Sequence, residues 1–98
     1  MADVQFSAFK ETVRSDLLAA SSGEFENAKT HGARFVVWAN RSFHAAFAGE
    51  SGSGLTFDEC PLFEANQYFE VWLESGQFLR FQAAAGETDG EIRITRVP

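Results

Sequence analysis

The chain has 98 residues, 45% of them apolar and 22% charged, with eight Lys and Arg against fourteen Asp and Glu for a net charge of −6. This size fits a single domain over residues 1–98, and the composition argues against a disordered chain. The acidic balance disfavours direct nucleic-acid binding, and the absence of any apolar run of roughly 18 residues argues against a membrane span. Cys60 is the only cysteine, so we expect no intramolecular disulfide and a cytoplasmic location; no secretory leader is recognised.

Residues 4–20 are predicted to form an N-terminal helix. Phe6, Phe9, Val13 and Leu17 recur at steps of three and four residues, which places them on one face of a helix. We expect this face to cover a sheet.

Residues 24–48 fit two descriptions, a long helix or a hairpin. The β-branched and aromatic run Phe35 to Trp38 disfavours a helix, and it resembles Phe69 to Trp72 farther along the chain. Each run is followed by a short polar break and a further aromatic segment. We therefore favour a hairpin here, with a second short helix over residues 24–30 before it.

Residues 49–66 are predicted to be a connection. The stretch 49–54 is rich in Gly and Ser and indicates a loop, and 55–66 is irregular or holds one helical turn opened by Pro61. Asp58, Glu59 and Glu64 form a predicted acidic patch. Their spacing lacks the alternating ligands of a calcium loop, so no metal is expected.

Residues 67–74 and 77–83 are predicted to pair as a hairpin. A three-residue loop ending at Gly76 would place Val71 opposite Leu79 and give one nearly pure apolar face. Gly76 would then adopt the left-handed conformation. A last strand is predicted over Glu91–Val97, with Ile92 and Ile94 pointing inward.

The other face of that hairpin is the predicted partner-binding surface. It would place Trp72 opposite Phe78 and Glu70 opposite Arg80, with Tyr68 alongside. Aromatic residues and Arg are enriched at the centres of protein interfaces. The alternative is that a helix or the first hairpin covers these rings.

The predicted fold is α+β, with the N-terminal helix packed on an antiparallel sheet of about four to five strands. The predicted function is a non-catalytic protein-binding module whose acidic second half approaches a basic surface on the partner. Small acidic inhibitors of nucleic-acid-handling enzymes, of the anti-restriction or anti-CRISPR type, are one such class, by analogy alone. Two alternatives remain open: a small enzyme or ligand-binding protein with an aromatic pocket between helix and sheet, and a self-associating structural subunit. No catalytic residue and no cofactor is predicted.

Overall fold

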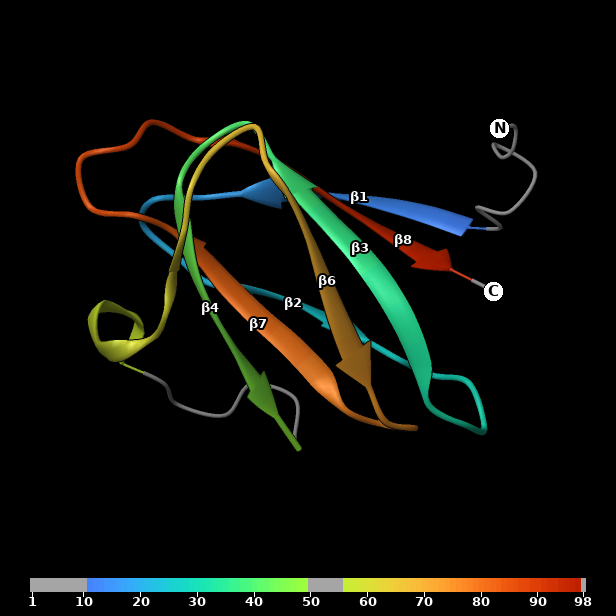
Figure 1. The fold of residues 1–98 in the computed structure, drawn as a ribbon. Coiled ribbons are helices and arrows are strands. Elements are labelled where there is room, and N and C mark those ends of the chain that lie inside the picture. The colour runs from blue at the N-terminus through green and yellow to red at the C-terminus, as the bar shows by residue number, and fades with distance from the viewer. Residues whose placement is uncertain (1–10, 50–55, 98) are drawn as a thin grey trace, which may run out of the picture.

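A computed structural model describes residues 11–49 and 56–97 (Figure 1). These residues form eight strands and one short 3₁₀ turn. The strands are β1 Glu11–Leu17, β2 Gly23–Glu26, β3 Ala33–Ala39, β4 Phe43–Ala48, β5 Leu62–Phe63, β6 Tyr68–Leu73, β7 Phe78–Ala83 and β8 Gly90–Val97, and the turn is η2 Phe57–Glu59.

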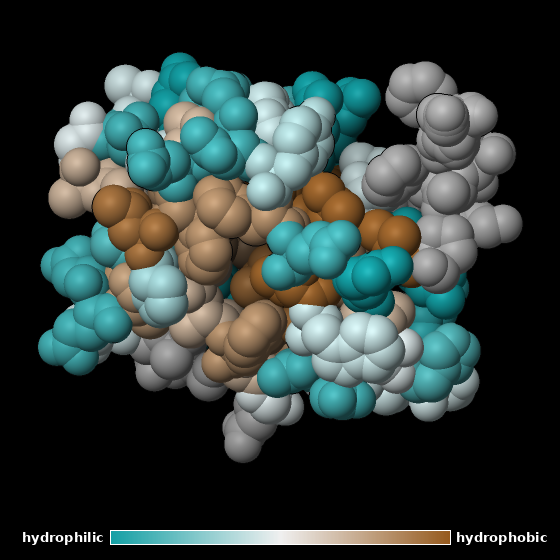
Figure 2. All heavy atoms as spheres, viewed as in Figure 1, coloured by the Kyte–Doolittle hydropathy of each residue, from teal (hydrophilic) through white to brown (hydrophobic). Residues whose placement is uncertain are grey.

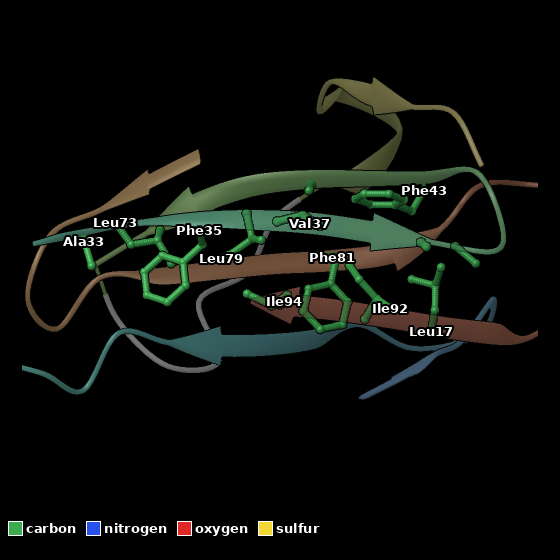
Figure 3. Packing of buried hydrophobic residues seen from close by; sticks show 13 residues of the cluster. Leu17, Ala33, Phe35, Val37, Phe43, Leu73, Leu79, Phe81, Ile92 and Ile94 are labelled. Atoms are coloured by element: carbon green, nitrogen blue, oxygen red, sulfur yellow. The ribbon is translucent and has the colours of Figure 1, made fainter. Parts of the chain in front are cut away.

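The strands are divided between two antiparallel sheets of four strands each. Their orders are β1-β8-β3-β6 and β2-β7-β4-β5. Buried side chains from both sheets point into the space between them, so the fold is a β-sandwich (Figure 3). Phe81 and Ile92 are fully buried there, and Phe35 and Ile94 are nearly so.

The alternation of apolar and polar residues explains which side chains enter this core. In β3, the residues Ala33, Phe35, Val37 and Ala39 are buried, whereas Arg34, Val36 and Trp38 between them point to the outer face. In the view of Figure 2, apolar residues gather across the middle of the molecule and hydrophilic residues surround them.

The predicted α+β fold is wrong, because no helix covers a sheet in the described part of the chain. The predicted helix over residues 4–20 is replaced by strand β1 from residue 11 onward, while residues 4–10 lie outside the described residues. The four-residue step from Val13 to Leu17 fits a strand as well as a helix, since four is also a multiple of the two-residue strand period. The predicted short helix over 24–30 is wrong as well, since β2 begins at Gly23.

Both predicted hairpins are wrong in their pairing, although their strands exist. β3 and β4 lie in different sheets, and so do β6 and β7. β6 pairs with β3, so that Val71 lies opposite Phe35, and β7 pairs with β4, so that Leu79 lies opposite Phe47. The apolar faces of β6 and β7 therefore meet across the core instead of standing side by side in one sheet.

The turn between β6 and β7 has the conformation that the sequence predicts. Gly76 has a φ of +77°, in the left-handed region that glycine adopts at little cost. Asn27, which is 1% exposed, stabilises this turn through two hydrogen bonds. Its backbone carbonyl accepts from the Gly76 N–H at 2.7 Å, and its side-chain amide donates to the Leu73 carbonyl at 2.9 Å. Two chain reversals are thus tied together by one buried side chain.

Other predictions on the connections have mixed outcomes. The last strand is confirmed, with Ile92 and Ile94 buried. The predicted loop 49–54 falls outside the described residues except for Gly49. The single helical turn of 55–66 exists as η2, but it precedes Pro61 and is not opened by it. Among the residues described here, no helix has the length and apolar character to cross a membrane.

Candidate functional site

The outer face of sheet β1-β8-β3-β6 carries its side chains in rows that run across the strands. The pairing registers place Arg14 beside Arg93, Arg93 beside Trp38, and Trp38 beside Tyr68, which makes one row over all four strands. The next row along the strands holds, in the same strand order, Thr12, Thr95, Val36 and Glu70. A third row brings Val97, Arg34 and Trp72 together.

The first two rows line an open concavity of about 1110 Å³. Its lining consists of the whole first row and three members of the second: Thr12, Arg14, Val36, Trp38, Tyr68, Arg93 and Thr95. We call this feature the sheet groove. It combines aromatic rings, two guanidinium groups and two hydroxyls, the last bonded to each other at 2.9 Å.

The charges in the sheet groove are both positive. Arg14 and Arg93 share one carboxylate, that of Glu91, which accepts from Arg93 Nε and lies 3.9 Å from Arg14 Nε. The hydrogen bond from Arg93 holds the pKa of Glu91 below its ordinary value. Desolvation opposes this lowering, and the charges of Arg93 and Arg14 add to it. Among the described residues that line the groove, the two arginines are the charged ones, and Asp16 and Glu91 lie beside its β1–β8 end.

The aromatic side chains of this face are held in defined positions. The Arg93 guanidinium lies 4.9 Å from the ring centroid of Trp38, a cation–π contact. Trp72, although 54% exposed, donates its indole N–H to Glu74 at 3.0 Å. Its ring also covers Gly32, where an added Cβ would stand only 2.7 Å from the ring.

The structure separates the five predicted partner-binding residues between two sheets. Tyr68, Glu70 and Trp72 lie on the outer face of β6 and are exposed, Tyr68 at 76%. Phe78 and Arg80 belong to β7 in the other sheet. The predicted joint face therefore does not form, and only its β6 half belongs to the sheet groove and its margin.

Arg80 is buried instead of exposed, and its predicted pairing with Glu70 is wrong. Its Nε lies 3.5 Å from Glu24 on the neighbouring strand β2, and its Nη2 donates to Ser22 at 2.7 Å. The ring centroid of Phe57 lies 6.0 Å from its guanidinium carbon. Ser22, Glu24 of β2 and Phe57 of η2 thus cover a side chain that the sequence predicted to be accessible to solvent.

The predicted acidic patch is exposed but lies apart from the sheet groove. Asp58 and Glu59 belong to η2, and Glu64 directly follows β5. In residues 11–49 and 56–97, no group of three or more His, Cys, Asp or Glu side chains is arranged to hold a metal ion. The aromatic pocket between helix and sheet lacks its helical wall there, and the groove lies on the outer face of a sheet instead.

Sequence reasoning missed the members of the groove that lie on β1, β3 and β8. Arg14, Trp38 and Arg93 are polar or aromatic residues at alternate positions of their strands, which is the signal for an outward-facing residue. That signal does not state which strands are neighbours. The predicted helix over residues 4–20 also concealed the alternation in β1.

Comparison with known proteins gave no match to a family model, a curated protein or a solved structure.

Proposed function

We propose that this protein is a non-catalytic protein-binding module, and that its contact surface is the outer face of sheet β1-β8-β3-β6. The observation that supports this is the exposure of Tyr68 and Trp72 beside a groove that also contains Trp38 and Arg93. Trp, Tyr and Arg are the residues most enriched among those that dominate binding energy at protein interfaces.

Rigidity of the exposed rings favours the same role. The hydrogen bond of Trp72 to Glu74 and the cation–π contact of Arg93 with Trp38 fix side chains before a partner arrives. Fixed side chains lose less conformational entropy on binding. The openness of the groove suits a segment of a protein better than a small molecule, since small-molecule sites bury most of their ligand's surface.

The test is site-specific photo-crosslinking in the cell of origin. The photoreactive residue p-benzoylphenylalanine replaces Tyr68 in one variant and Phe47 in a control variant. Phe47 is an aromatic residue on β4, in the other sheet, and is 50% exposed. We expect a crosslink to a second protein from position 68 and not from position 47. A product with twice the mass of the chain would indicate a self-associating subunit instead, and equal products from both positions would contradict the proposed surface.

A substitution checks the energetic role of the face. Trp72→Ala is expected to weaken the partner captured from position 68 by about 2 kcal/mol or more, with a small effect on folding because the ring is half exposed. Phe47→Ala is the matched control. Loss of folding with unchanged residual affinity would count against the proposal.

A further inference from the structure

We infer that the sheet groove receives an acidic peptide segment of the partner, with a carboxylate between Arg14 and Arg93 and an apolar side chain against Tyr68. This rests on the proposed function, namely that this face binds protein. It differs from the expectation of a basic partner surface, because the acidic patch at η2 and β5 lies outside the groove.

The placement of the two arginines carries the inference. They lie directly opposite each other on β1 and β8, and like charges in this position destabilise a sheet. In the described part of the chain, both guanidinium groups pair with the carboxylate of Glu91, and Asp16 lies opposite Glu91 on the same face. The side chain of Arg14 is 70% exposed, so its guanidinium is accessible to a carboxylate of another molecule. A guanidinium binds a carboxylate through two parallel hydrogen bonds, which suits it to this role.

Charge also indicates which end of the groove receives the carboxylate, and it favours a peptide over a polyphosphate. Glu70 lies on β6 at the far end of the second row, so a carboxylate is favoured at the β1–β8 end of the groove and disfavoured near Tyr68. A polyphosphate is a poor occupant, because phosphate binding needs clustered cations and this chain has a net charge of −6. A peptide with one acidic side chain and few other charges can pair with the arginines and avoids repulsion by the acidic chain.

The width of the sheet gives the spacing of the expected motif. Neighbouring strands are about 4.8 Å apart, so three spacings from Arg14 to Tyr68 span about 14 Å. An extended peptide advances about 3.4 Å per residue, so this distance corresponds to about four residues. From Arg93 to Tyr68 the two spacings correspond to about three residues. We therefore expect Asp or Glu three or four positions from a large apolar or aromatic residue.

The experiment is selection of binders from a displayed library of random dodecapeptides against the full chain. Synthetic copies of the enriched peptides are then titrated into ¹⁵N-labelled protein. The chain has two tryptophans, and therefore two indole N–H signals: Trp38 lines the groove, and Trp72 does not. We expect enrichment of the acidic–apolar spacing and a larger shift of the Trp38 signal than of the Trp72 signal.

Matched arginine variants test the contact itself. Arg14→Gln is expected to weaken the enriched peptides roughly tenfold or more, because charge-assisted hydrogen bonds are lost. Arg34→Gln removes the same charge from an exposed residue of the same face outside the groove lining, and should change the affinity less than about twofold. Both substituted residues are exposed, and unchanged thermal unfolding of each variant verifies that it is folded.

The outcomes separate this inference from the proposed function. Enriched peptides that bind this face without an acidic residue, or that bind Arg14→Gln and Arg34→Gln equally well, overturn the acidic segment and leave the protein-binding face in place. Failure to enrich any peptide, or peptides that perturb only the sheet β2-β7-β4-β5, also overturns the inference. The crosslinks from position 68 then decide the proposed function independently.

Discussion

Replacing Asn27 by alanine is expected to destabilise this fold more than most single substitutions of a polar residue would. Asn27 precedes the turn that leads into β3, and its side chain reaches the turn between β6 and β7. Its amide nitrogen donates to the carbonyls of His31 at 3.1 Å, Leu73 at 2.9 Å and Glu74 at 3.3 Å. Asn27→Ala removes both amide protons from this set of acceptors.

The magnitude follows from burial. Each hydrogen bond contributes roughly 0.5–1.5 kcal/mol, and a buried polar group left without its partner costs about 1–3 kcal/mol. Asn27 is 1% exposed and Leu73 is fully buried, so water cannot replace the lost donor at the Leu73 carbonyl. We expect a loss of about 2–4 kcal/mol in the free energy of unfolding, a large share of the roughly 5–15 kcal/mol typical of native proteins.

Urea unfolding followed by tryptophan fluorescence measures this loss as a lower midpoint at an unchanged slope. Asn27→Asp is the matched variant, since it keeps the shape and the acceptor oxygen but replaces the donating nitrogen. It should be at least as destabilising as Asn27→Ala at neutral pH. A stability of Asn27→Ala within about 0.5 kcal/mol of the parent protein, or a harmless Asn27→Asp, would refute the reasoning.

Two further predictions concern packing and charge. Gly23→Ala places a Cβ 2.6 Å from the fully buried ring of Phe81, so we expect a loss of about 1–3 kcal/mol in thermal unfolding. Gly49→Ala adds its Cβ to open space and should change stability by less than about 0.5 kcal/mol; equal losses for the two would contradict the packing described. Arg93→Gln should raise the pKa of Glu91 toward its ordinary value in an NMR titration of the carboxyl carbon, since the hydrogen bond from Arg93 is the main cause of the lowered pKa. A lowered folded-state pKa adds stability above the unfolded-state pKa and loses it as the pH falls through the folded-state value, so the variant should lose less stability in acid. An unchanged Glu91 pKa would contradict the contact.

The local pattern of the chain predicted several strands and the faces of their side chains. The runs that become β6 and β7 alternate between apolar and polar residues, and the structure buries Leu73, Leu79 and Phe81 as this alternation indicates. Exposure of Trp72 follows from the same alternation. The left-handed Gly76 was predictable because a short turn after an alternating strand requires a residue free of a Cβ.

Strand partners were not predictable from the same pattern. A turn with a left-handed glycine can return the chain within one sheet or carry it to the opposite sheet, and both routes bury the apolar face of each strand. Alternation specifies a face and leaves the neighbour open. In this protein β6 joins β3, so Glu70 lies opposite Val36 and Arg80 lies beneath residues of β2 and η2.

The sheet groove could not be predicted either, because the alternation of residues does not show which strands are neighbours. Arg14, Trp38, Tyr68 and Arg93 come from four strands spread over most of the chain, and only the registers of three strand pairs bring them into one row. Arg14 also lies within the region predicted as a helix, so the sequence analysis did not assign it to the outer face of a sheet.

The pairing of β6 with β3 is the basis of the proposed binding face, and backbone NOEs measure it most directly. In an NMR study of the labelled protein, we expect cross-strand NOEs between Glu70 and Val36 and between Trp38 and Arg93. NOEs between Glu70 and Arg80 would instead place β6 and β7 side by side in a hairpin, and would contradict the sandwich together with its groove.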